Sequence, residues 1–147
     1  MDEAQVVART EGGKAAAVSP ASILPPSILI VENEALVASA MEDVLGESGF
    51  RIVGIAGSGV EALSLAAESR PSLALVDIRL SGPIDGIELA CLLHQKFGLR
   101  TIFSSALLDD ATAERAQAAQ PLGFLPKPVR PSQMFNLIED ALTSLRA

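Results

Sequence analysis

From Ser27 onward, short apolar runs alternate with segments in which apolar residues recur every three or four positions. A run of four to six apolar residues is typical of a strand buried on both faces, and the wider spacing is typical of an amphipathic helix. The pattern therefore predicts five strands, each followed by a helix. The predicted strands are 28–31, 51–56, 73–77, 101–105 and 122–125, and the predicted helices are 36–45, 58–69, 86–97, 109–120 and 131–145.

This regular alternation of strand and helix determines the expected fold class. Parallel neighbours need a crossover between them, and the crossover helices cover the faces of the sheet. We therefore expect an α/β fold with a doubly wound, five-stranded parallel sheet. Binding sites in such sheets lie beyond the carboxyl ends of the strands.

Residues 1–26 lack this periodicity. They contain Gly12-Gly13, a run of alanines, and the prolines Pro20, Pro25 and Pro26. Glycine and proline in such clusters are typical of loops. We predict a disordered or weakly structured N-terminal tail, with at most a weak helix over residues 2–10, and one domain over residues 27–147.

Composition narrows the classes of partner. The formal net charge is −7 and the sequence carries no basic stripe, which argues against binding to nucleic acid.

Cys91 is the single cysteine, so no internal disulfide can form. The chain shows neither a signal peptide nor an apolar stretch near the roughly 20 residues of a membrane helix. We expect a cytoplasmic protein that does not enter the membrane.

Chemically distinctive side chains stand at the ends of four of the five predicted strands. Glu32 and Asn33 follow the first strand, Asp77 ends the third, Ser105 ends the fourth and Lys127 follows the fifth. Two carboxylates and an amide oxygen are hard ligands suited to Mg²⁺. A hydroxyl and an ammonium can hold phosphate oxygens. An aspartate between a metal and an ammonium can act as the nucleophile in phosphoryl transfer.

Several motifs occur in order along residues 27–147 and together resemble one known family. The motifs are Val31-Glu32-Asn33-Glu34, Leu75-Val76-Asp77-Ile78-Arg79-Leu80, Asp85-Gly86-Ile87-Glu88-Leu89, Ser105-Ala106 and Gly123-Phe124-Leu125-Pro126-Lys127-Pro128. In these positions the chain resembles a response-regulator receiver domain of two-component signalling, which has a (βα)5 flavodoxin-like fold.

The resemblance implies roles for the residues at the strand ends. Asp77 would accept a phosphoryl group from a histidine kinase, a phosphotransfer protein or a small phosphodonor. Glu32, Asn33, Asp77 and the backbone carbonyl of Arg79 would surround Mg²⁺. Lys127 would pair with the phosphoryl group.

The resemblance also implies a switch and an output surface. Ser105 would move toward the phosphoryl oxygen and Phe124 would turn inward with it, and the Lys127–Pro128 peptide bond would be cis. Signalling would pass to the face made by the fourth helix, the fifth strand and the last helix, which could also form a homodimer. We expect a stand-alone phosphoacceptor, not an enzyme, although it can catalyse its own phosphoryl transfer and dephosphorylation. Its downstream protein partner is not identified by the sequence.

Two positions depart from the family pattern. Asn33 stands where the family usually has an acid, so the site loses one negative charge and should bind Mg²⁺ less tightly. The loop Ser81-Gly82-Pro83-Ile84 after Asp77 is slightly long and contains a proline.

Two alternatives remain. A pseudo-receiver would share the fold but would never be phosphorylated, and Asn33 is its support. A dinucleotide-binding domain is suggested by Gly57-Ser58-Gly59-Val60-Glu61-Ala62, which follows a predicted strand and opens a helix. That fingerprint normally follows the first strand, whereas here it follows the second.

Overall fold

The computed structural model describes residues 25–146. The predicted tail, including the weak helix over residues 2–10, lies outside the described residues apart from Pro25 and Pro26. These two prolines belong to neither a helix nor a strand.

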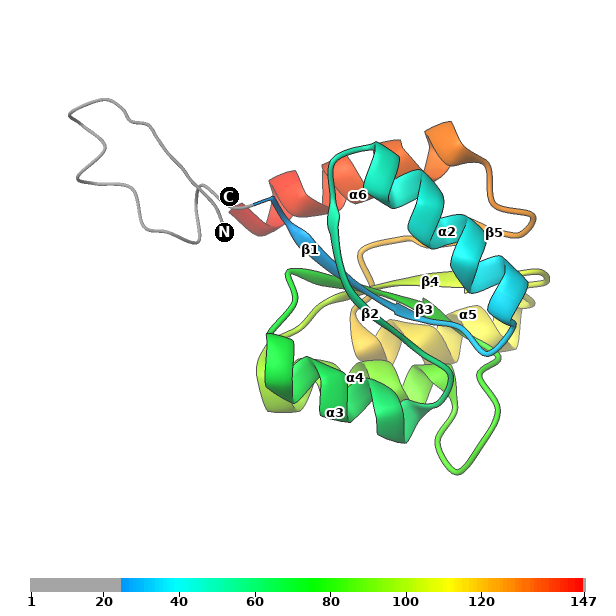
Figure 1. The fold of residues 1–147 in the computed structure, drawn as a ribbon. Helices are drawn as coiled ribbons and strands as arrows, with labels where there is room; N and C mark the ends of the chain where they lie inside the picture. Colours follow the sequence, from blue (N-terminus) through cyan, green and yellow to red (C-terminus); the bar gives the residue numbers. More distant parts are fainter. Residues whose placement is uncertain (1–24, 147) are drawn as a thin grey trace.

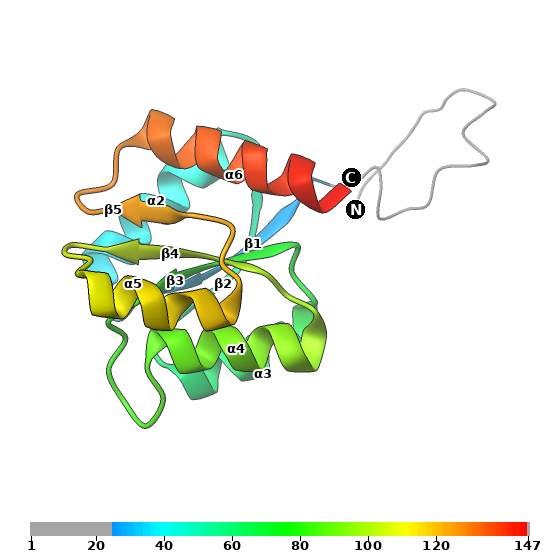
Figure 2. The same ribbon diagram turned by 180° about the vertical axis from the view of Figure 1, so that it is seen from behind.

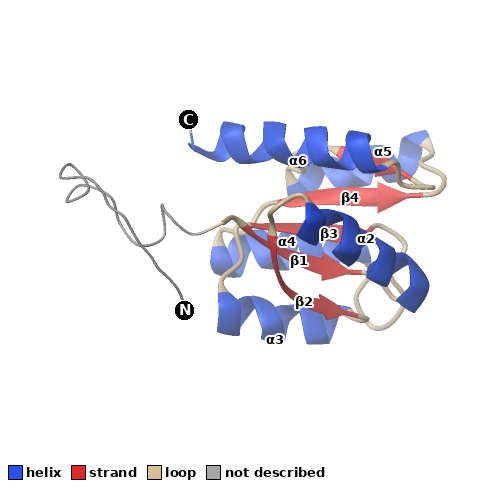
Figure 3. Cartoon of the chain, turned by 45° about the horizontal axis from the view of Figure 1, so that its top comes forward, coloured by secondary structure: helices blue, strands red, loops and turns tan. Residues whose placement is uncertain are grey.

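The strands form one parallel sheet, as predicted. They are β1 (Ser27–Val31), β2 (Arg51–Ala56), β3 (Leu73–Asp77), β4 (Thr101–Ser105) and β5 (Phe124–Pro126). Their spatial order is β2-β1-β3-β4-β5, and every neighbouring pair is parallel. The arrows in Figure 3 accordingly point in a common direction.

Helices cover both faces of the sheet. They are α2 (Ala35–Glu47), α3 (Gly59–Ser69), α4 (Gly86–Phe97), α5 (Asp110–Ala116), the 3₁₀ turn η4 (Gln117–Ala119) and α6 (Pro131–Arg146). Helices α2 and α6 lie on one face, while α3, α4 and α5 lie on the other (Figures 1 and 2). Among the helices of residues 25–146, none combines the length and the apolar composition needed to cross a bilayer.

The central strands are apolar throughout because each of their faces meets a helical layer. In β1, Ile28 and Ile30 pack into the cluster beneath α2 and α6, whereas Leu29 and Val31 pack into the cluster beneath α3 and α4. Successive side chains of a strand point to opposite faces. A strand that is buried on both sides therefore loses the polar–apolar alternation of a surface strand.

Short local signals begin three of the helices. The side chain of Ser58 caps α3, that of Asp109 caps α5, and that of Asp85 caps α4. Asp85 and Glu88 form a reciprocal capping box, in which each side chain accepts a hydrogen bond from the other residue's backbone N–H. These contacts satisfy backbone donors that have no partner within the helix.

The predicted helix over residues 109–120 is shorter in the structure. It ends as α5 at Ala116 and continues only as the 3₁₀ turn η4. Gln120 has a positive φ of 52° and precedes Pro121. A residue before proline is restricted from the helical region, so the helix cannot pass this point.

The fifth strand also differs from its prediction over residues 122–125. It spans Phe124–Pro126, with Pro126 opposite Ser105 of β4. Proline lacks a backbone N–H, but β5 is an edge strand, where one side of the backbone has no strand partner. The edge position therefore allows Pro126 to be the last residue of the strand.

The strand order places a topological switch between β1 and β3. The chain crosses from β1 outward to β2, then returns past β1 to β3 and continues to β4 and β5 on the other side. Connections leave β1 and β3 in opposite directions, which opens a crevice beyond their carboxyl ends. Residues that follow β1, β3 and β5 meet around this crevice.

Gly86 allows α4 to begin directly against the end of β3. A Cβ at this position would collide with the carbonyl oxygen of Asp77 and would lie 2.8 Å from Cα of Ile78. Both atoms belong to the backbone, so the collision cannot be relieved by a side-chain rotation. Because Gly86 has no side chain, the backbone of Asp77 can lie directly against the start of α4.

We predict that Gly86→Ala destabilises the fold by about 1–3 kcal/mol, because overpacking a rigid contact forces the backbone to shift. The free energy of unfolding in urea, followed by circular dichroism, measures this effect. Gly46→Ala is the matched control, since a Cβ there meets nothing within 4 Å. Gly46 lies in a helix, so this control should stabilise the protein by roughly 0.5–1 kcal/mol. Equal effects of the two substitutions would contradict the prediction.

Candidate functional site

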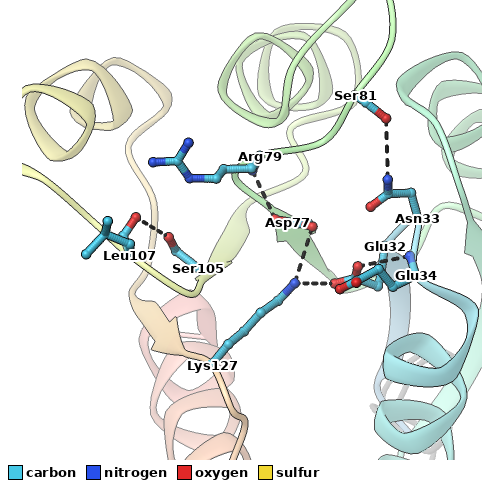
Figure 4. A network of polar contacts seen from close by, with 9 residues as sticks. All are labelled: Glu32, Asn33, Glu34, Asp77, Arg79, Ser81, Ser105, Leu107 and Lys127. Carbon is cyan, nitrogen blue, oxygen red and sulfur yellow. Dashed lines mark hydrogen bonds and ion pairs between the residues drawn. The ribbon is translucent and has the colours of Figure 1, made fainter.

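One ammonium and two carboxylates form the centre of the crevice. Nζ of Lys127 lies 2.8 Å from Oε1 of Glu32 and 3.3 Å from Oδ2 of Asp77. Glu32 is 3% exposed and Asp77 is 7% exposed. Figure 4 shows the lysine reaching between the two acids. The sequence-predicted residues Glu32, Asp77 and Lys127 are therefore in direct contact.

The strand register explains how these distant residues meet. Val31 of β1 lies opposite Val76 of β3, so Glu32 and Asp77 occupy adjacent positions just beyond that pair. The backbone N–H of Lys127 donates to the carbonyl of Ser105 at 2.9 Å, which holds the lysine at the end of β4. The Lys127–Pro128 bond is cis, as the resemblance implied.

Each carboxylate also accepts a hydrogen bond from the backbone. Oε2 of Glu32 accepts from the N–H of Glu34 at 3.1 Å, and Oδ1 of Asp77 accepts from the N–H of Arg79 at 3.0 Å. Both acids thus have one oxygen held by the backbone and one facing Lys127. Hydrogen bonds of this kind restrict the orientation of a carboxylate.

Lys127 remains charged despite its burial. Burial acts to lower the pKa of Lys127, but the hydrogen bond to Glu32 and the charges of Asp77 and Glu32 outweigh it. The pKa of the ammonium consequently lies above its ordinary value of 10.5. The site keeps a permanent positive charge beside Asp77 at neutral pH.

The donor atoms fit a weak magnesium site. Two carboxylates, from Glu32 and Asp77, lie beside the amide of Asn33 and the backbone of Arg79 (Figure 4). Mg²⁺ usually takes one or two protein carboxylates and keeps several waters, so this set of oxygens is sufficient. Among residues 25–146, no three acidic, histidine or cysteine side chains gather into a cluster suited to a metal.

Ser105 ends β4 beside this centre, whereas Phe124 lies opposite Phe103, two residues before that strand end. The hydroxyl of Ser105 donates to the carbonyl of Leu107 at 2.9 Å and so points away from the acid (Figure 4). The ring of Phe124 packs against that of Phe103, with centroids 5.9 Å apart. The roles predicted for these two residues as a switch stay predictions.

Two features of the crevice were not predicted. The side-chain amide of Asn33 donates to the hydroxyl of Ser81 at 3.4 Å, across two loops. An apolar groove of about 410 Å³ also lies between α2 and α6 and extends to Lys127. The groove is lined by Leu36, Val37, Ala40, Met41, Val44, Lys127, Pro128, Val129, Pro131 and Met134. Leu36, at the start of α2, is 87% exposed. The sequence could not indicate this exposure, because Leu36 there belongs to the apolar spacing of the predicted helix.

The glycine-rich segment after β2 does not have the geometry of a dinucleotide site. The N–H of Gly57 donates to the carboxylate of Glu61 at 2.7 Å, and the N–H of Glu61 donates to the hydroxyl of Ser58 at 3.2 Å. These backbone donors would otherwise bind a pyrophosphate. The acidic side chain of Glu61, in the first turn of α3, would repel that anion.

Comparison with known proteins agrees with the geometry. Residues 28–139 match the family model described as the response regulator receiver domain. The transcriptional regulatory protein PdtaR of Mycobacterium tuberculosis is 33% identical over 123 residues, which cover 84% of this chain and 60% of PdtaR. The phyllosphere-induced regulator PhyR of Methylorubrum extorquens is 32% identical, over 83% of this chain and 45% of PhyR. The chain thus spans about half the length of these curated relatives.

Solved structures show the same fold. The signal receiver domain of a modulated diguanylate cyclase from Desulfovibrio desulfuricans G20 superimposes with a TM-score of 0.78 at 37% identity. The match covers 82% of this chain and 95% of that one. A receiver domain protein from Methanospirillum hungatei JF-1 superimposes with a TM-score of 0.75 at 24% identity, which is similarity of fold alone.

We predict that Lys127→Gln lowers the free energy of unfolding by roughly 1–2 kcal/mol at pH 8, because two buried carboxylates lose their shared partner. The raised pKa means that the stabilisation is present in full below about pH 10.5 and is lost as pH rises through the pKa of the folded protein. Urea unfolding of both proteins at pH 8 and pH 11 should show a smaller difference at pH 11.

Lys96→Gln provides the control, because Lys96 is an exposed residue of α4. It should change stability by no more than about 0.5 kcal/mol at either pH. A difference between wild type and Lys127→Gln that is independent of pH would contradict the role given to the ammonium.

Proposed function

The chain belongs to the response regulator receiver domain family, and we propose that it accepts a phosphoryl group on Asp77 in a magnesium-dependent reaction in the cytoplasm. The observation that carries the proposal is the contact of Lys127 with the buried carboxylates of both Glu32 and Asp77. A buried acid beside a fixed cation is the arrangement that a nucleophilic aspartate needs. In this role the protein is a phosphoacceptor and not an enzyme acting on a separate substrate.

In the proposed reaction, a carboxylate oxygen of Asp77 attacks the phosphorus of the donor. A new P–O bond forms while the bond from phosphorus to the leaving group breaks. The leaving group is the imidazole of a phosphohistidine or the acetate of acetyl phosphate, and it departs with the electron pair. Lys127 offsets the negative charge of the phosphoryl oxygens. Electrostatic stabilisation of this kind is usually the largest contribution that a protein makes to phosphoryl transfer.

The proposed metal contacts come from the same edge of the sheet. Glu32, Asp77, the amide oxygen of Asn33 and the backbone carbonyl of Arg79 would hold Mg²⁺. Bound there, Mg²⁺ supplies positive charge against the phosphoryl oxygens. Because Asn33 carries no charge, we propose that this site binds the ion more weakly than one with an acid at the same position.

The proposed partners are proteins that contact the surface around the crevice. Lys127, which contacts Asp77, also lines the groove between α2 and α6. We propose that a phosphodonor protein seated in this groove brings its phosphohistidine near Asp77. The exposed side chain of Leu36 provides apolar surface for that contact. We propose a histidine kinase or phosphotransfer protein as donor, and the surface of α5, β5 and α6 as the output or dimer contact.

The decisive experiment is intact-protein mass spectrometry after incubation with acetyl phosphate and Mg²⁺. Wild type should gain the mass of one phosphoryl group, and Asp77→Asn should gain none, because an amide cannot form the acyl phosphate. Asp109→Asn is the matched control, since Asp109 is an exposed helix cap and asparagine also caps helices well.

Two outcomes would contradict the assignment. An adduct that persists in Asp77→Asn would show that another residue accepts the phosphoryl group. A wild-type protein without any adduct, at a Mg²⁺ concentration that saturates binding, would favour the pseudo-receiver.

We also predict that Asn33→Asp increases Mg²⁺ affinity by roughly tenfold, because a full negative charge replaces a neutral amide close to the ion. Isothermal titration calorimetry measures the affinity directly. The sequence contains no tryptophan or tyrosine, so calorimetry is preferable to fluorescence. Equal affinities of wild type and Asn33→Asp would be inconsistent with a metal contact at residue 33.

A further inference from the structure

The glycine-rich segment that opens α3 lies against the loop that follows Asp77. Gly59 is the first residue of α3 and is buried. A Cβ at Gly59 would collide with Cγ1 and Cδ1 of Ile84, which precedes α4 by two residues. Gly59 is helical and its φ is not positive, so its backbone conformation would accept any residue. Glycine is therefore needed here for the space that Ile84 occupies, and not for the shape of the backbone.

The side chain of Ile84 has little freedom to avoid a larger residue at position 59. It is half-buried and packs against the apolar cluster beneath α3 and α4. Isoleucine is branched at Cβ, which restricts its χ1 angle, and close-packed surroundings leave few other rotamers. A side chain at position 59 would therefore displace the backbone of Ile84 as well as its side chain.

Such a displacement would reach the phosphoacceptor within two residues. A Cβ at Gly86 would meet the carbonyl oxygen of Asp77, so the segment 84–86 ends directly against the Asp77 backbone. The same carbonyl accepts from the N–H of Leu80 at 3.2 Å and closes a turn. Within that turn, the N–H of Arg79 donates to Oδ1 of Asp77 at 3.0 Å. One backbone carbonyl thus contacts both the segment 84–86 and the turn that orients the carboxylate.

From these contacts we infer that Gly59 is a positioning residue for Asp77, acting through Ile84 and Gly86. Because Gly59 carries no side chain, Ile84 can lie on the start of α3, and the segment 84–86 can stay against the backbone of the phosphoacceptor. The inference rests on the proposed function and deepens it. It also gives a role to the glycine-rich segment after β2 and to the slightly long loop after Asp77.

Paired substitutions at the two contacting positions test whether Ile84 is the reason for glycine. Gly59→Ala alone should lower the urea midpoint of unfolding, because it overpacks a close contact. In an Ile84→Ala background it should instead raise the midpoint, because alanine is the better helix former. Cβ of residue 84, which alanine retains, would lie 3.7 Å from the added Cβ, an ordinary contact. The same direction of change in both backgrounds would overturn the inference.

Two further measurements test the effect on Asp77, each under conditions where every variant is fully folded by circular dichroism. Gly59→Ala should shift the ¹⁵N–H resonance of Arg79, which reports the hydrogen bond to the carboxylate. It should also slow phosphorylation by saturating acetyl phosphate and Mg²⁺ roughly three- to thirtyfold, since a misplacement of about 1 Å can cost up to about 100-fold. Adding Ile84→Ala should reverse both changes.

Gly46→Ala is the matched control, because a Cβ at this helical glycine meets nothing within 4 Å. It should leave the Arg79 resonance and the phosphorylation rate unchanged. If Gly59→Ala does not fold, Gly59→Ala combined with Ile84→Val takes its place in both measurements, since valine keeps Cγ1 and lacks Cδ1.

The outcomes separate this inference from the proposed function. A destabilised Gly59→Ala protein with the wild-type Arg79 resonance and phosphorylation rate would show a purely structural role and overturn the inference. Changes that Ile84→Ala does not reverse would also overturn it. If wild type gains no phosphoryl group, the proposed function fails and the Arg79 resonance alone decides. A shift in Gly59→Ala that the double variant reverses would then support the positioning of Asp77, and an unchanged resonance would refute it.

Discussion

The contact between Lys127 and the two acids organises the functional edge of this protein. Glu32 and Asp77 are almost fully buried, and they approach the same ammonium from neighbouring strands. Two buried carboxylates would repel each other without a shared cation. Lys127 offsets that repulsion and at the same time connects the segment after β5 to the ends of β1 and β3. The crevice depends on this balance of charge as much as on the strand order that opens it.

Asn33 also affects the charge of the crevice. The side chains around Lys127 contribute two negative charges, from Glu32 and Asp77, against one positive charge. Asn33 adds an amide but no charge at this edge of the sheet. In the proposed magnesium site, less negative charge would therefore remain to attract a divalent cation.

The arrangement of Ser105 indicates how the site would respond to a phosphoryl group. Its hydroxyl donates to the carbonyl of Leu107, in the loop that leads into α5. In the proposed function, contact of Ser105 with a phosphoryl oxygen on Asp77 would require this hydrogen bond to break. Phe124 begins β5 and packs on Phe103 of β4, two residues before Ser105. We propose that such a change is passed on to the surface formed by α5, β5 and α6.

The sequence by itself determined the fold class, the order of the elements and the main chemical groups. Apolar runs, helical spacing and caps such as Ser58 and Asp85 act over a few residues, so they can be interpreted without a structure. One error occurred where the position of a strand in the sheet decides the outcome, and the other where the local effect of a proline was not recognised. The strand β5 includes Pro126 because it lies at the edge of the sheet, and the helix after Asp109 ends early because Pro121 restricts Gln120. Only the tertiary structure decided that Lys127 contacts both Glu32 and Asp77, that Ser105 faces Leu107, and that Asn33 is held by Ser81. These contacts join residues from different strands and loops, and their geometry follows from the register and packing of the sheet.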